Sequence, residues 1–353
     1  MFLLTALAPI ERITPLLCNS TRSFRSSLPK EALLVLSGNP KFPSGIHRLR
    51  TMTQPSWSLS ASSDAIGASN KNVSENEFSH FMDKSCLLIV GPGVLGKLVG
   101  EKWQQDYPGC HIVGQTMTTD HHDELVKLGI NPSLKGKSDR KCPNIIFCAP
   151  PSRTADYFGD IRVAISNWSG EGSFLFTSST AVYDYQDNEM YDEDCPAVPI
   201  GRSPRTDVLL KAENTVLEAG GCVLRLAGLY KADRGAHIYA LKKGVIEAHP
   251  DHILNLIHYE DAASLAIAIM KTNLRGRVFL GCDNNYISWR ELMDCVNQSE
   301  KYSNKILAFT GTAELNGHNL GKKMNNSRTR VEIGWNPKYP SFPLFLGLPG
   351  DQS

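Results

Sequence analysis

Gly91, Gly93 and Gly96 are spaced as Gly-x-Gly-x-x-Gly, a pattern whose chemistry is the binding of a pyrophosphate. The first glycine permits a tight turn, the second lets the backbone approach the anion, and the third lets a helix pack close to a strand. Val94 and Leu95 lie inside the motif, where the free N–H groups of a helix N-terminus attract negative charge. A short apolar run precedes the motif and a helix-like run follows it. We therefore predict a dinucleotide-binding site here; a strand–turn–helix with a purely structural role is the alternative.

Hydroxyl side chains gather where a later apolar run ends. Thr177, Ser178 and Ser179 close that run, and Tyr183 follows shortly after. At the carboxyl end of a central strand, such side chains point into the ligand crevice and can hydrogen-bond a reacting oxygen. Solvated hydroxyls at a strand edge would give the same pattern, so composition alone leaves both interpretations open.

Two further segments bear on the cofactor. Ala149 and Pro150 follow another apolar run, where small residues leave room for a dinucleotide. An NAD-binding chain usually places Asp or Glu about 20 residues after the glycines. Here Thr116 and its neighbours are uncharged, and the first acid is Asp120. Because no carboxylate repels a 2′-phosphate there, the sequence favours NADP, and NAD stays open.

Strand-like and helix-like segments alternate after residue 84. The expected strands are 87–90, 111–115, 144–148, 173–177, 221–226 and 277–280, and the expected helices are 96–105, 122–129, 153–168, 205–219 and 260–272. This alternation predicts an α/β fold with a Rossmann-type doubly wound parallel sheet.

The first 60 residues have a different composition. They are rich in Arg and Ser, and their only acids are Glu11 and Glu31. Such a bias is typical of an organelle transit peptide, and it favours a chloroplast over a mitochondrion. An untargeted tail, or a start at Met52 that removes the leader, are the alternatives. We expect a transit peptide at 1–60, a polar disordered linker at 61–83 and an NAD(P)-binding domain at 84–347.

Charge and composition argue against several other functions. The net charge is +1, so no overall attraction to nucleic acid is expected. No apolar run approaches the ~20 residues that a membrane span requires. The nine cysteines include no Cys-x-x-Cys pair, and the ten histidines show no ligand spacing, so we expect no metal site.

Four motifs occur together in order. They are Gly-x-Gly-x-x-Gly, Thr-Ser-Ser-Thr-Ala-Val-Tyr at 177–183, Cys-Val-Leu-Arg-Leu-Ala-Gly-Leu-Tyr at 222–230 and Asn-Leu-Ile-His-Tyr-Glu-Asp-Ala-Ala at 255–263. In this order they resemble the extended short-chain dehydrogenase/reductases, the NAD-dependent epimerase/dehydratase superfamily. The segments 321–326 and 333–340 are similar to the tail of an atypical nucleoside-diphosphate-sugar-epimerase-like subgroup. The resemblance implies a smaller C-terminal substrate lobe, mainly after residue 228, and a homodimer.

The catalytic pair of that family is missing. The family uses Tyr-x-x-x-Lys on one helix, where the lysine lowers the pKa of the tyrosine. Aligning the Ala-Glu end of the matching segment puts Arg205 at the tyrosine position and Leu209 at the lysine position. Shifting the alignment by two residues uses Lys211, but then Asp207 stands in place of tyrosine. Of the family's catalytic positions, only that of Ser179 is kept.

Two classes of function therefore stay open. The first is an NAD(P)-dependent oxidoreductase or epimerase that acts on a small or nucleotide-linked substrate through a non-standard active site. Ser179 would bond the reacting oxygen there, and Tyr183, Arg205, Asp207 or Lys211 would transfer a proton or stabilise charge. The second is a dinucleotide sensor without turnover, or an organelle protein that binds RNA or another protein; the charge balance does not favour RNA. The sequence does not identify the substrate.

The transit-peptide interpretation predicts that residues 1–80 direct a passenger protein into an organelle, where the leader is removed. Fusing these residues to a fluorescent protein tests this, and we expect fluorescence in chloroplasts because of the Arg/Ser bias. Fluorescence spread evenly through the cytosol would contradict the prediction.

Overall fold

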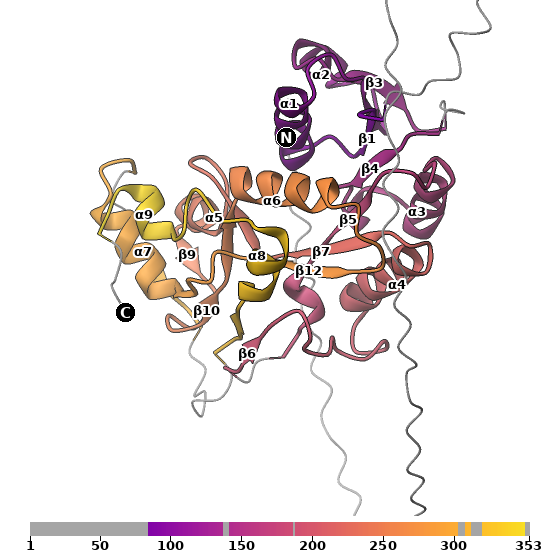
Figure 1. Cartoon of the computed structure of the whole chain (residues 1–353). Helices are drawn as coiled ribbons and strands as arrows, with labels where there is room; N and C mark the ends of the chain where they lie inside the picture. Colours follow the sequence, from indigo (N-terminus) through magenta and orange to yellow (C-terminus); the bar gives the residue numbers. More distant parts are fainter. Residues whose placement is uncertain (1–83, 137–140, 186–187, 303–307, 312–319, 350–353) are drawn as a thin grey trace, which may run out of the picture. The chain divides into compact units, whose positions relative to one another are not determined.

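The computed structural model describes residues 84–136, 141–185, 188–302, 308–311 and 320–349. The expected transit peptide (1–60) and linker (61–83) lie outside these residues. Seven strands form one parallel sheet in the order β12-β7-β5-β4-β1-β2-β3 (Figure 1). They are β1 (Leu87–Val90), β2 (Ile112–Thr116), β3 (Asn131–Leu134), β4 (Asn144–Phe147), β5 (Phe174–Ser179), β7 (Cys222–Leu226) and β12 (Val278–Gly281). The predicted doubly wound α/β fold is therefore confirmed.

Both faces of this sheet are buried, because side chains alternate along each strand. In β1, Leu87 and Ile89 belong to one hydrophobic cluster, whereas Leu88 and Val90 belong to another. The period of two follows from strand geometry. Burial on both faces is typical of parallel sheets, and it explains why the central strands read as continuous apolar runs.

Helices cover the two faces. α1 (Val94–Asp106) and α6 (Tyr259–Lys271) pack together on one face, and α3 (Tyr157–Ser166) packs with α4 (Pro204–Glu218) on the other (Figure 1). α2 (His122–Lys127) packs against β3. The start of each helix lies within a few residues of the predicted position.

A further hydrophobic cluster is built only from residues after 229. It joins α5 (Ala236–Lys243), α7 (Trp289–Gln298) and α9 (Phe342–Leu346), which lie together in Figure 1. Short strand pairs accompany it: β8 (Gly228–Tyr230) with β11 (Leu256–His258), β9 (Val245–Ile246) with β14 (Ala308–Phe309), and β10 (Ile253–Leu254) with β13 (Ile287–Ser288). β6 (Met190–Tyr191) pairs with β15 (Lys323–Met324), and α8 (Ser327–Ile333) follows. The later part of the chain also returns to the main sheet through α6 and β12.

The sequence did not predict β3, which forms one edge of the sheet. Its residues, Asn-Pro-Ser-Leu, are exposed or half-buried, so no apolar run marks them. Pro132 has no N–H to donate, which is tolerated because β3 pairs only with β2. Backbone pairing rather than side-chain burial defines this strand.

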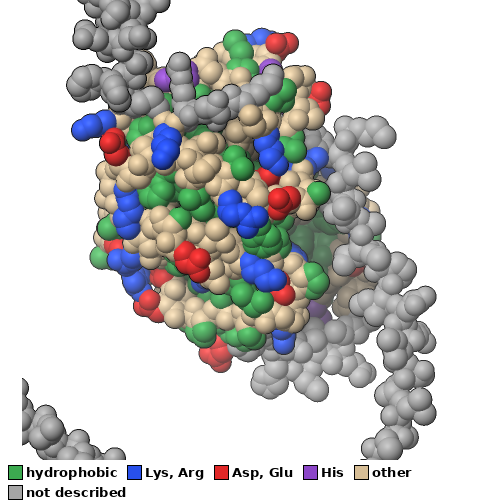
Figure 2. Space-filling model, turned by 90° about the vertical axis from the view of Figure 1, so that its right-hand side faces the viewer, with side chains coloured by type: hydrophobic (Ala, Val, Ile, Leu, Met, Phe, Trp, Pro, Cys, Tyr) green, Lys and Arg blue, Asp and Glu red, His purple; other side chains and the backbone are tan. Residues whose placement is uncertain are grey.

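Membrane-spanning helices, metal-binding groups and surface charge bear on the sequence-based expectations about other partners. Among the described residues, no helix combines the length and apolarity needed to cross a bilayer, and no group of three or more His, Cys, Asp or Glu is placed to hold a metal ion. On the face drawn in Figure 2, Lys and Arg side chains are interspersed with Asp and Glu. That face therefore offers no continuous basic patch for a nucleic-acid backbone.

Candidate functional site

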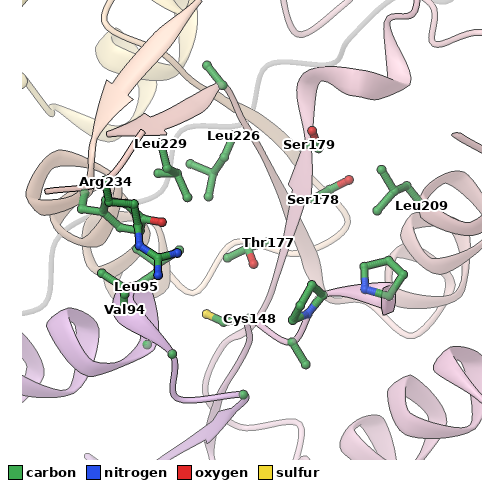
Figure 3. Close-up of a pocket in the computed structure, with 18 of the residues that line it drawn as sticks. Val94, Leu95, Cys148, Thr177, Ser178, Ser179, Leu209, Leu226, Leu229 and Arg234 are labelled. Atoms are coloured by element: carbon green, nitrogen blue, oxygen red, sulfur yellow. The ribbon is translucent and has the colours of Figure 1, made fainter. Parts of the chain in front are cut away.

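A cavity of about 340 Å³ lies at the carboxyl ends of β1, β4, β5 and β7 (Figure 3). Most residues predicted for the cofactor line it, and the predicted catalytic Ser179 joins them. The predicted cofactor residues at the cavity are Gly91, Gly93, Val94, Leu95, Gly96, Ala149, Pro150, Thr177 and Ser178. They meet because the loops that follow parallel strands leave the sheet at the same edge.

The cavity lies where the strand order reverses. From β1 the chain extends through β2 to β3 in one direction, whereas β4, β5, β7 and β12 extend in the other. Because β1 and β4 are neighbours, the loops that follow them lead to opposite sides and leave a crevice between. Ligands of open parallel sheets bind at such a point.

The structure explains two of the three motif glycines by packing and leaves the third to another cause. Gly91 has a φ of +79°, and a Cβ on it would lie 2.7 Å from the backbone of Ala149. A Cβ on Gly96 would lie 2.8 Å from Ile89 Cγ2. Packing therefore requires both glycines. A Cβ on Gly93 would meet only a carbonyl oxygen at 4.0 Å, and its φ of −77° suits any residue, so packing does not explain this glycine.

The hydroxyl groups at the end of β5 differ in what they bond. Thr177 Oγ1 donates to a backbone carbonyl at 3.1 Å, and Ser178 Oγ donates to Glu213 Oε1 at 2.5 Å. Ser179 Oγ accepts a hydrogen bond from Ala181 N at 3.1 Å and donates to no described group. The hydroxyl hydrogen of Ser179 is therefore free to bond a ligand in the cavity.

A buried ion pair supports this strand end from behind. Arg225 Nη2 lies 2.7 Å from Glu213 Oε2, and the two residues are 8% and 1% exposed. Arg225 Nη1 donates to Tyr183 OH at 2.6 Å, and Tyr183 OH donates to Asp192 O at 3.1 Å. Because Ser178 also bonds Glu213, the network joins β5, β7 and α4.

Two of the predicted residues lie elsewhere in the fold. Tyr183 is fully buried in the ion-pair network, and burial raises the pKa of its hydroxyl. It does not line the cavity, so the structure does not place it for proton transfer to a ligand there. Thr116 lies at the end of β2, outside the cavity lining, where its Oγ1 is 2.8 Å from His122 Nε2.

Helix α4 brings an apolar side chain to the cavity. Leu209 lines it, whereas the predicted catalytic residues Arg205 and Lys211 are exposed and do not. The described lining residues include no Lys, His, Asp or Glu, so they form no Tyr–Lys pair.

Sequence reasoning missed three polar residues of the lining, Tyr157, Arg234 and Tyr259. Tyr157 OH donates to Ala149 O at 3.0 Å, and burial raises its pKa. Tyr259 begins α6 and stands inside one of the motifs, which was a usable signal. Arg234 lies in the loop after β8, and its position shortly after a strand was the one sequence signal for a role at the site.

Comparison with known proteins shows similarity in fold. The sequence matches no protein-family model and no curated protein. A functionally unknown conserved protein from Silicibacter pomeroyi is 20% identical with a TM-score of 0.60, covering 74% of this chain and 96% of that chain. A dTDP-glucose 4,6-dehydratase from Bacillus anthracis, in complex with NAD, is 14% identical with a TM-score of 0.60 and coverages of 74% and 94%. A UDP-glucose 4-epimerase from Thermotoga maritima, with UDP-glucose, is 15% identical with a TM-score of 0.59 and coverages of 74% and 96%. These likenesses support the Rossmann-type fold.

The buried ion pair behind β5 predicts a strong and non-additive effect on stability. Arg225→Met leaves the carboxylate of Glu213 buried without its partner, which should lower the free energy of unfolding by about 3–5 kcal/mol. The double variant Arg225→Met/Glu213→Leu removes both charges and should recover most of that loss. Urea unfolding of wild type, Arg225→Met, Glu213→Leu and the double variant measures this. A double variant as unstable as the sum of the single variants would contradict the coupling.

Proposed function

We propose that the chain binds a nicotinamide dinucleotide, with the pyrophosphate over the motif glycines. Gly93 carries this proposal. A Cβ there would project into open space at the cavity, and the backbone conformation does not require glycine. A glycine that packing does not need is explained where a ligand must approach the backbone closely. Gly93 is also the N-cap residue of α1 and has no side chain to cap it, which leaves N–H groups of the first turn for an anion.

The end of β2 supports NADP as the preferred form. Thr116 and His122 offer a hydroxyl and an imidazole there. The nearest acid along the chain, Asp120, already accepts a hydrogen bond from Thr118 Oγ1 at 3.0 Å. Asp120 keeps its negative charge, so the proposal rests on the absence of Asp and Glu from β2 itself, where an NAD-binding chain usually holds the ribose with a carboxylate. NAD is the form in the Bacillus anthracis dehydratase complex, so both forms belong in a binding test.

We further propose an oxidoreductase or epimerase reaction on a small or nucleotide-linked substrate. The cofactor supplies hydride transfer when it is bound. Ser179 would donate its free hydroxyl hydrogen to the reacting oxygen of the substrate, where a fixed donor stabilises developing negative charge. Leu229 and Arg234 line the same cavity from beyond residue 228, which supports a substrate-binding role for the C-terminal lobe.

Leu209 favours a second candidate function, a dinucleotide sensor without turnover. A lysine at this position would lower the pKa of a nearby phenol, and leucine cannot. Of the phenols at the cavity, Tyr157 has a raised pKa because of burial, so it is a poor base at neutral pH. Binding needs only the glycine motif and the cavity, both of which are present.

The dinucleotide proposal predicts that Gly93→Val abolishes binding while the protein stays folded. The new side chain would fill the space of the pyrophosphate, and its Cβ would lie no closer than 4.0 Å to any atom beyond its chain neighbours. The free energy of unfolding should change by about 1 kcal/mol or less, because valine is a poorer N-cap residue than glycine. Calorimetric titration with NADPH and NADH measures binding. Gly96→Ala is the contrasting variant, because its Cβ would lie 2.8 Å from Ile89 Cγ2 and should destabilise the fold. Equal affinity of wild type and Gly93→Val would refute the site.

The catalytic proposal predicts that Ser179→Ala lowers the turnover rate about 10²–10³-fold, the usual effect of losing one donor to an oxyanion. Lys211→Ala should change little, because Lys211 is exposed and does not line the cavity. The assay uses a carbonyl or nucleotide-sugar substrate found by screening. A rate kept in Ser179→Ala and lost in Lys211→Ala would show that the shifted alignment is right. Tight cofactor binding without turnover on any substrate would favour the sensor.

A further inference from the structure

Arg234 is the only charged side chain among the described residues that line the cavity. It belongs to the loop between β8 and α5. Figure 3 shows its guanidinium extending toward Val94 and Leu95 in the first turn of α1. An exposed cation therefore faces a helix N-terminus at the same cavity.

The loop holds the backbone of Arg234 and leaves the charge of its side chain unneutralised. Lys231 N donates to Arg234 O at 2.8 Å, and Arg234 N donates to Lys231 O at 3.1 Å. The neighbouring acid, Asp233, forms an ion pair with Lys231 at 2.9 Å. Gly235 turns the chain into α5 with a φ of +132°. Arg234 itself forms no ion pair with any described residue, so its charge stays available to a ligand.

Two sources of positive potential thus converge on one space. The N-terminus of a helix carries a partial positive charge, and its N–H groups point outward along the axis. Arg234 adds a full charge on the other side, and the described lining residues include no carboxylate. Like charges brought together this way repel each other unless an anion lies between them.

We propose that Arg234 binds a phosphate group of the ligand in this cavity, opposite the N-terminus of α1; this rests on the proposed dinucleotide site. A tetrahedral phosphate accepts hydrogen bonds from the guanidinium on one side and from helix N–H groups on the other. A planar carboxylate presents its oxygens in one plane and suits the guanidinium alone. The phosphate belongs either to the pyrophosphate of the cofactor or to a nucleotide-linked substrate.

Calorimetry on the full chain distinguishes the two sources. The variants are Arg234→Gln, which removes the charge, Arg234→Lys, which keeps it, and Arg162→Gln, an exposed arginine on α3 that does not line the cavity. The first titration uses NADPH and NADH in turn, and the second uses UDP on protein saturated with whichever dinucleotide binds more tightly. Uridine carries the same base without phosphate and serves as the ligand control. Thermal unfolding of each variant checks the fold.

We expect Arg234→Gln to lower the affinity for a phosphate ligand by about 10- to 100-fold, which corresponds to the loss of one charged hydrogen bond. Arg234→Lys should recover part of the loss, and Arg162→Gln should bind like wild type. A loss for the dinucleotide assigns Arg234 to the cofactor, and a loss for UDP alone assigns it to the substrate. Unchanged affinity for both ligands in Arg234→Gln would overturn the role of Arg234 and leave the dinucleotide site standing. UDP binding by a wild type that binds neither NADPH nor NADH, lost in Arg234→Gln, would overturn only the dinucleotide site. A wild type that binds neither dinucleotide and no UDP would overturn both proposals.

Discussion

The close contact between Gly91 and Ala149 is the constraint on which the cavity depends. Gly91 turns the chain away from β1 in the left-handed region, and a Cβ there would overlap the backbone of Ala149. β1 and β4 are neighbours, so this contact fixes the two loops that diverge at the point where the strand order reverses. Gly96 then lets α1 lie against Ile89, which aims the helix N-terminus at the cavity. A side chain at either glycine would displace these parts together.

The ion pair of Arg225 and Glu213 decides which hydroxyl a ligand can use. Ser178 donates to Glu213 and Tyr183 accepts from Arg225, so both groups are committed to the interior. Ser179, the next residue along β5, is left with a free hydrogen. A buried ion pair is weak evidence for stability, because desolvation offsets the attraction. Its effect here is geometric, since it ties β5, β7 and α4 into one arrangement behind the cavity.

The glycine turn and the central strands could be predicted from local patterns. Burial on both faces produces short apolar runs, and the strand–turn–helix motif has a fixed glycine spacing. Tyr183 shows where that reasoning ends. Its spacing from Ser179 gave its distance along the chain, but the turn at Thr180–Val182 directs it into the core. Arg234 was missed for the opposite reason, because only the folded sheet brings its loop beside α1. Residue type was readable from the sequence, and side-chain direction and long-range proximity were not.

The character of the cavity limits the chemistry that it can perform. Burial raises the pKa of Cys148 to about 12 and also raises that of Tyr157, so both side chains stay protonated at neutral pH. Leu209 of α4 also lines the cavity and brings no charge to either group. The charged side chain among the described lining residues is Arg234, Ser179 keeps a free hydroxyl hydrogen, and Tyr259 adds a further phenol. Such a lining suits negative charge on a ligand, and neither Cys148 nor Tyr157 takes a proton from it at neutral pH. A reaction that removes a proton here would need a base other than these two groups, whereas a ligand that only binds needs none.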